Sequence, residues 1–189
     1  MEFDEVLIKR RSIRRFKQTP VEDEKLSEMI DAARFAPSGG NTQTLRYYIV
    51  RDKHAVEDIF KHTKWGANVA PRRNPVWGLS APPVFIAVSA PRDSSPQADA
   101  GAAIQNMMLK ASERGVGTCW LGSFNPGKTA ETIKSAPGEK IIFLVAVGYP
   151  DESPICEDIP AGHSTKYYLD KDDVIHVPKF TVAAITKWI

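Results

Sequence analysis

The sequence predicts one domain in which helices and strands are mixed. Two segments carry apolar residues at helical spacing behind capping residues, and four short runs rich in β-branched, aromatic or other apolar residues predict strands. The chain has 189 residues, enough for one domain with a sizeable core. We find no internal repeat, low-complexity tract or linker, so we assign residues 1–189 to a single domain.

The N-terminal part predicts two helices. Residues 3–9, FDEVLIK, can form a short amphipathic helix. A clearer helix is expected within 19–40, where Thr19 would be the N-cap, Pro20 would take the first position and Glu22 would complete a capping box. A proline and a glycine pair end this pattern.

A second strong helix is expected within residues 95–115, with Ser95 as its N-cap and Gly115 as its stop. Small residues along one side predict close packing against another helix; they are Ala100, Gly101 and Ala103. Shorter helices are expected over 53–63 and after Asn125.

Strands are expected at 45–52, 84–90, 118–124 and 140–150. The run 84–90 is almost continuously apolar, which predicts a buried strand. Residues 64–83 carry four prolines and two tryptophans without periodicity, and so long a loop is usually functional or mobile. Beyond about residue 150 we expect irregular structure that ends in a β-rich stretch, 177–185.

Composition excludes several classes of function. The 25 Lys and Arg against 23 Asp and Glu leave a net charge of only +2, which argues against a general nucleic-acid binder. The two cysteines are far apart and lack metal-ligand spacing, as is typical of a reducing cytosol. No apolar stretch approaches the ~20 residues needed to span a bilayer. We therefore expect a cytoplasmic protein without a membrane, nucleic-acid or metal partner.

The basic stretch KRRSIRRF, residues 9–16, is the first candidate ligand site. In an extended chain Arg10, Ser12 and Arg14 point to one side, whereas Arg11 and Ile13 point to the other. Two guanidiniums beside a hydroxyl suit a phosphate, and Ile13 would anchor the segment in the core. Taken alone, the stretch is explained equally well as a solvated basic patch.

Two further segments have weaker signals. APSGGNTQ, residues 36–43, combines small residues with the amides of Asn41 and Gln43, so a flat ligand could approach its backbone, although a plain helix stop explains it more simply. GVGTCWLG, residues 115–122, is not a dinucleotide fingerprint, because Trp120 stands where the third glycine is required.

Other candidates carry little specific signal. The four histidines show neither metal nor nucleophile-partner spacing, and Cys119 within an apolar strand is predicted to be a buried small hydrophobe. Ser164 and Lys166 offer a second contact for an anion.

Taken in order, RRSIRRF, LSEMIDAARFAPSGGNTQ, APPVFIAV, DAGAAIQNMMLKASERGVGTCWLG and VAVGYP resemble the nitroreductase family of flavin mononucleotide (FMN) enzymes. The resemblance covers most of residues 5–150. It implies an α+β fold with a central, mostly antiparallel sheet flanked by helices. It also implies an intertwined homodimer, with each C-terminal segment extending onto the partner and FMN at the subunit interface.

The resemblance also implies which residues bind FMN. By position, Arg10, Ser12 and Arg14 would contact the phosphate and the pyrimidine edge, and Arg11 belongs to the same motif. The turn that the other subunit lays against the cofactor would consist of Pro37, Ser38, Gly39, Asn41 and Gln43. The remaining contacts would come from the backbone of Leu121 and Gly122 near the reactive nitrogen, and from Ser164 and Lys166 on the phosphate.

Two departures from the family pattern bear on this set. Gln43 is followed by Thr44 and Leu45, where the family often has Pro-Trp. Ser164 stands where a second basic residue is common, so phosphate affinity would depend more on Arg10.

The implied reaction needs no catalytic side chain. NADH or NADPH would reduce FMN and leave, and an electron-poor acceptor such as a nitroaromatic or a quinone would take its place. Arg14 and the Gly122 N–H would tune the flavin. Trp65 and Trp77 either line the pocket and contribute to substrate specificity or are aromatic residues that cover the protein surface.

Three rival hypotheses stay open. One is a flavin-fragmenting or reductively dehalogenating relative, and the second is a non-catalytic flavin-binding protein. The third is a basic-patch nucleic-acid binder, whose affinity would fall steeply with salt.

Overall fold

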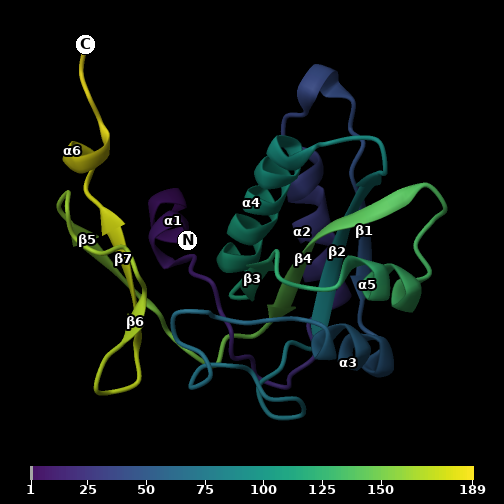
Figure 1. The fold of residues 1–189 in the computed structure, drawn as a ribbon, viewed down its shortest axis with the longest axis horizontal. Coiled ribbons are helices and arrows are strands. Elements are labelled where there is room, and N and C mark those ends of the chain that lie inside the picture. Colours follow the sequence, from purple (N-terminus) through teal and green to yellow (C-terminus); the bar gives the residue numbers. More distant parts are fainter. Residues whose placement is uncertain (1) are drawn as a thin grey trace.

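The centre of the computed structural model, which describes residues 2–189, is an antiparallel sheet of four strands (Figure 1). The strand order is β1-β2-β4-β3, and every neighbouring pair is antiparallel. The bounds are Arg46–Val50 for β1, Val84–Pro91 for β2, Gly117–Leu121 for β3 and Glu139–Gly148 for β4. All four strands lie where the sequence predicts them, with ends that differ by up to three residues.

Helices cover both faces of this sheet. Along β2, Val84, Ile86 and Val88 pack with α2 and α4 on one face, whereas Phe85 and Ala87 pack with α3 and α5 on the other. This double covering explains why the strand is apolar at consecutive positions instead of alternating. The helices span Asp23–Arg34 (α2), Lys53–Lys61 (α3), Gln97–Glu113 (α4) and Pro126–Ile133 (α5). The predicted α+β fold with a flanked antiparallel sheet is confirmed.

The small residues of α4 allow close packing, as predicted. Ala100 and Ala103 are buried, and Ala103 packs in the core cluster with α2. The approach is close enough for the Asn106 amide to donate a hydrogen bond to the Ala32 carbonyl oxygen at 3.3 Å. A Cβ at Gly101 would lie 3.7 Å from the Trp120 ring.

The predicted N-caps of the two strong helices are wrong. α2 begins at Asp23, after Glu22 in an extended conformation, and no side chain caps it. Val21, in the predicted first turn, is buried, and the Glu22 carboxylate accepts a hydrogen bond from the Tyr149 hydroxyl at 2.5 Å instead of completing a capping box. α4 likewise follows Pro96 without a side-chain cap, so Ser95 is not its N-cap.

The caps of the shorter helices and the stop of α4 have clear physical causes. The Asp52 carboxylate accepts from Ala55 N–H before α3, and the Asn125 side chain accepts from Lys128 N–H before α5, both at 3.0 Å. Gly115 has φ +72°, the left-handed conformation that was expected at the end of α4.

A short helix and an extended segment form the N-terminal part of the chain. α1 spans Phe3–Lys9, as predicted. After it, Ile13 N–H donates to the Thr118 carbonyl oxygen at 2.9 Å, and Lys17 N–H donates to that of Tyr149 at 2.8 Å. Ile13 and Phe16 are buried. Apolar side chains and backbone hydrogen bonds therefore fix the basic segment against the ends of β3 and β4.

The chain beyond residue 150 forms a second sheet, in the order β5-β7-β6, beside α1 and away from the main sheet (Figure 1). Its strands are Ile155–Ile159 (β5), Tyr168–Leu169 (β6) and Ile175–Phe180 (β7), followed by helix α6 at Val182–Ile185. The expectation of an irregular tail is therefore wrong, because β5 and β7 pair in parallel across a long connection. The β-rich stretch is a strand in its first half and a helix in its second.

One histidine joins the strands of this second sheet. The His176 ring contacts Glu157 through Nδ1, and Nε2 lies 3.0 Å from Asp170 Oδ2. The Tyr168 ring stacks on it with centroids 5.0 Å apart. The hydrogen bonds with Glu157 and Asp170 raise the pKa of His176.

The aromatic residues of loop 64–83 pack against the main domain. Trp65 and Trp77 both contact Phe60, with ring centroids 6.2 and 5.7 Å apart. Trp65 is buried, and its indole N–H donates to the Thr63 hydroxyl at 2.8 Å.

Cys119 is buried, as predicted, and burial raises the pKa of its thiol to about 11. None of the helices within residues 2–189 is long and apolar enough to cross a membrane.

Candidate functional site

The basic segment shows the predicted alternation. Arg11 and Ile13 are buried, whereas Arg10, Ser12 and Arg14 are half-buried. The alternation is one of burial, because Arg10 lines the same pocket as Arg11 and Ile13. A backbone bridge between Ser12 and Thr118 holds the segment parallel to β3. Because the bridge uses only the backbone of Ser12, its hydroxyl is left for a ligand.

Arg11 has a structural role that the sequence analysis missed. Its Nη2 donates to the Leu7 carbonyl oxygen at 2.8 Å, which satisfies an acceptor in the last turn of α1. Its Nε is buried without a hydrogen-bond partner. Burial and the adjacent Arg11 charge both lower the pKa of Arg10. The two guanidiniums therefore form a concentration of positive charge that an anion would stabilise.

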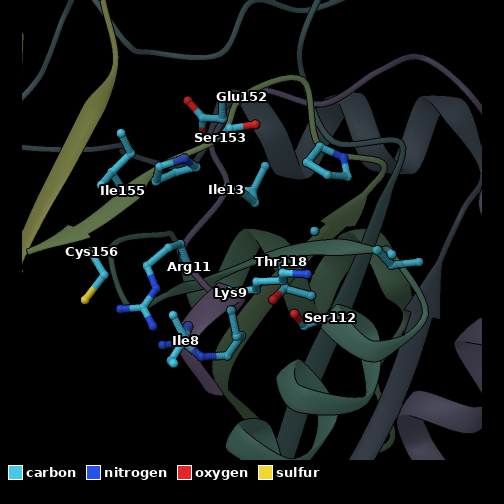
Figure 2. A pocket seen from close by; sticks show the side chains of 16 residues that line it. Ile8, Lys9, Arg11, Ile13, Ser112, Thr118, Glu152, Ser153, Ile155 and Cys156 are labelled. Atoms are coloured by element: carbon cyan, nitrogen blue, oxygen red, sulfur yellow. The ribbon is translucent and has the colours of Figure 1, made fainter. Parts of the chain in front are cut away.

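A pocket of about 560 Å³ opens beside this pair (Figure 2). Figure 2 shows Arg11 reaching between Ile8 and Cys156 into the pocket. Its wall combines three cationic residues, one carboxylate, three hydroxyls and several apolar side chains; among them are Lys9, Arg10, Arg11, Glu152, Ser112, Thr118, Ser153, Ile13 and Ile155. Positive charge, hydroxyl donors and apolar surface together suit an amphipathic anion.

Arg14 lies against the C-terminal part of the chain. Its guanidinium carbon is 4.8 Å from the centroid of the Tyr167 ring, a cation–π contact. Gly66, with φ +47°, lies under the Arg14 side chain, and a Cβ there would be only 3.2 Å from Arg14 Cδ. Lys166 precedes Tyr167, and its N–H donates to the Ser164 hydroxyl at 3.3 Å. Ser164 and Lys166 are thus brought near Arg14, although both side chains are exposed.

The end of β3 leaves space for a flat ligand. Leu121 is buried, but Gly122 is exposed, and a Cβ added there would meet nothing within 4 Å. Because β3 is the strand beside which Ser12 runs, this open backbone lies on the same edge of the sheet as the basic segment. A group that approaches Gly122 would find open space at the place where a Cβ would stand.

The turn 37–43 is held in an unusual conformation. Gly39 N–H donates to Asp99 Oδ1 at 3.2 Å, and Gln43 N–H donates to the Ser38 hydroxyl at 3.2 Å. Asn41 and Gln43 have φ of 54° and 48°, which non-glycine residues rarely adopt. Such local strain is concentrated at functional sites. Pro37 lines a separate pocket of about 220 Å³ here.

Within one chain, this turn does not meet the basic segment. The two pockets share no lining residue. The turn contacts Asp99 near the start of α4, whereas Ser112 near the end of α4 lines the pocket with Arg10. At 1.5 Å per residue, these ends of the helix are roughly 20 Å apart. Figure 1 shows the 3-10 turn Gly39–Asn41 beyond the end of α4 that is remote from α1.

The sequence analysis missed Glu152 and Tyr167. Glu152 accepts hydrogen bonds from the backbone N–H groups of Arg14 and Arg15. No sequence pattern indicates such a residue, since a carboxylate can accept hydrogen bonds from any pair of peptide N–H groups. Tyr167 could have been suspected from its place next to Lys166. In the part of the chain that the structure describes, no cluster of three His, Cys, Asp or Glu could hold a metal ion.

Comparison with known proteins gives a consistent result. Residues 7–149 match the model of the nitroreductase family. A candidate NADH dehydrogenase/NAD(P)H nitroreductase of Archaeoglobus fulgidus is 29% identical over 147 residues, which cover 76% of this chain and 82% of the relative.

Solved structures agree. A nitroreductase family protein from Clostridium novyi NT has a TM-score of 0.67 at 28% identity, over 80% of this chain and 86% of the other. An FMN-dependent nitroreductase from Clostridium difficile R20291 has a TM-score of 0.65 at 28% identity, over 79% and 88% of the two chains.

Proposed function

Because the chain belongs to the nitroreductase family, we propose that it is an FMN-dependent oxidoreductase. It would take electrons from NADH or NADPH and pass them to an electron-poor small molecule such as a nitroaromatic or a quinone. The single domain is proposed to extend over residues 1–189.

The observation that carries this proposal is the positive charge of Arg10 and Arg11 beside the start of β3, together with the open backbone of Gly122 after the other end of the same strand. Burial and mutual repulsion lower the pKa of Arg10, and the buried Arg11 Nε has no partner. A phosphate would neutralise this pair, and the empty space over Gly122 would admit a planar ring on the same strand edge. The residues present therefore fit FMN, with both its phosphate and its flat ring.

We assign the following roles to the chain's own groups. Arg10 and the Ser12 hydroxyl bind the phosphate, with Lys166 and Ser164 as further donors. Arg14 places a positive charge where negative charge accumulates, and the Gly122 N–H offers a hydrogen bond to the ring. When bound, FMN supplies the two-electron chemistry, so none of these side chains has to act as an acid or base.

The complete site is proposed to need two chains. The turn 37–43 is remote from the basic segment of its own chain, so a second copy would have to supply it. Large apolar residues are exposed on two elements that project from the main sheet: on α1 they are Phe3, Leu7 and Ile8, and beyond β7 they are Val182, Ile185, Trp188 and Ile189. Such a set is typical of a surface buried by a partner. We expect light scattering to give the mass of a dimer.

Visible absorption tests the cofactor and the reaction. The purified protein, or the protein reconstituted with FMN, should show a flavin spectrum, and anaerobic NADH or NADPH should bleach it. A protein that cannot be reconstituted would contradict the proposal. A flavin spectrum that neither nucleotide bleaches would favour one of the rival hypotheses, a non-catalytic flavin-binding protein or a family member that catalyses another reaction.

Paired variants test the phosphate assignment. Arg10→Ala combined with Ser12→Ala should weaken FMN binding at least about tenfold, because charge-assisted hydrogen bonds are lost. Arg92→Ala removes an equal charge from an exposed position outside both pockets and should leave affinity unchanged. Equal FMN retention by the double variant and the wild type would show that the phosphate binds elsewhere.

A further inference from the structure

Glu152 carries a carboxylate that is almost fully buried; its side chain is 3% exposed. Its Oε1 accepts from the peptide N–H of Arg14 and, at 3.2 Å, from that of Arg15. A carboxylate is kept away from water only where hydrogen bonds and opposite charge offset the loss of hydration. This carboxylate thus fixes the backbone from which the Arg14 side chain leaves the segment.

Arg73 supplies the opposite charge and connects three parts of the chain. Its Nη1 is 3.9 Å from Glu152 Oε2, and its Nη2 is 3.2 Å from Asp173 Oδ2. Arg73 belongs to loop 64–83, and Asp173 to the turn before β7. Arg15 strengthens the connection, because its Nη2 donates to the Arg72 carbonyl oxygen at 2.9 Å.

The same loop also holds the ring beneath Arg14. Asn68 N–H donates to the Tyr167 hydroxyl at 3.4 Å, and Gly66 leaves room for the Arg14 side chain. The loop therefore contacts both partners of the cation–π pair. If the loop moved, neither the Arg14 backbone nor the Tyr167 ring would keep its present support.

We propose that Glu152 and Arg73 are positioning residues that hold Arg14 in the orientation that binds the cofactor. This inference rests on the proposed function, since it takes Arg14 to face FMN. Loop 64–83 then has a defined role, because its docking through Arg73 and Asn68 orders Arg14 against Tyr167. Arg73 lies outside the pocket beside Arg10 and Arg11, whereas Glu152 lines it. The proposed role of Glu152 depends on its hydrogen bonds to the backbone of Arg14 and Arg15.

The first test replaces Glu152 with glutamine, which keeps the shape and one acceptor but removes the charge. We expect Glu152→Gln to raise the FMN dissociation constant about tenfold, the order expected for charge-assisted hydrogen bonds. Asp151→Asn is the matched control, because it removes a carboxylate from the neighbouring exposed position. The control should stay within about twofold of the wild type. An unchanged dissociation constant in a folded Glu152→Gln protein would overturn the proposal.

The second test asks whether Glu152 acts through Arg14. FMN titrations of Arg14→Ala and of the double variant Arg14→Ala/Glu152→Gln complete a double-mutant cycle. When Arg14 is absent, we expect Glu152→Gln to change the FMN dissociation constant by less than about twofold. An equal loss with and without Arg14 would mean a general structural role and would overturn the inference.

Arg73→Gln provides an independent route if Glu152→Gln does not fold. We expect it to weaken FMN binding at least about threefold. Arg51→Gln, which breaks an exposed ion pair with Asp23, should not weaken it. Equal affinities in these two variants would contradict the role of Arg73. Absence of FMN binding in the wild type would instead defeat the proposed function, so the two failures are distinguishable.

Discussion

Replacing Gly117 with alanine tests how tightly the basic segment is packed against the sheet. A Cβ at this position in β3 would lie 2.9 Å from Ile13 Cγ1, 3.1 Å from its Cβ and 3.2 Å from its Cγ2. Ile13 is buried in the core, and its N–H is bonded to Thr118, so it cannot recede without losing a backbone hydrogen bond. Overpacking of this kind costs about 1–3 kcal/mol.

The assay is urea unfolding followed by circular dichroism, with the midpoint and slope fitted together. Gly127→Ala makes the same chemical change within α5, where the nearest atom to the new Cβ would be Asn125 Oδ1 at 3.5 Å. It should stabilise the protein by up to about 1 kcal/mol, because alanine favours helices. The two substitutions therefore have opposite expected signs.

A double variant identifies the clash. Ile13→Ala alone should cost about 2–5 kcal/mol through the cavity it leaves. In the Gly117→Ala background, Ile13→Ala should cost at least about 0.5 kcal/mol less, because it removes Cγ1 and Cγ2 of Ile13, which would meet the new Cβ. Wild-type stability of Gly117→Ala, or purely additive losses, would refute the reasoning about this contact.

Two other predictions concern titratable groups. Under native conditions a thiol reagent should modify Cys156 and spare Cys119, whose thiol is buried with a pKa of about 11; modification of both before unfolding would contradict this. The pKa of His176 is raised above its ordinary value of about 6.5. The protonated imidazole therefore stabilises the fold fully at pH values below 6.5, and this stabilisation is lost as the pH rises through the raised pKa. The stability advantage of the wild type over His176→Gln should therefore shrink as the pH rises above about 6.5, and a pH-independent difference would argue against the charged pairing.

Local patterns in the sequence predicted the main sheet and its helices well. The apolar run in β2 and the helical spacing in α2 and α4 reflect burial against neighbours on both sides, which periodicity reports directly. Alternation also separated Arg10, Ser12 and Arg14 from Arg11 and Ile13. These predictions hold because the residues concerned interact mainly through their side chains.

The failures involve pairings over long distances in the chain. Thr19 is not a cap, and Glu22, the predicted partner in its capping box, accepts a hydrogen bond from Tyr149, far along the chain. The sheet β5-β7-β6 depends on a parallel pairing that neither strand shows by itself. Glu152 was missed for the same reason, since its partners are backbone groups of residues near the N-terminus.

The contact between Glu152 and Arg14 has a consequence for biosynthesis. The two residues are separated by 138 positions. At about 5–20 residues per second, a ribosome needs on the order of 10 s to make the chain between them. During that interval the basic segment has neither Thr118 nor Glu152 to dock on until each has been made, so it leaves the ribosome early and folds late. Cofactor capture is then expected among the last events of maturation, and a truncated nascent chain would expose an arginine-rich segment with no place to fold.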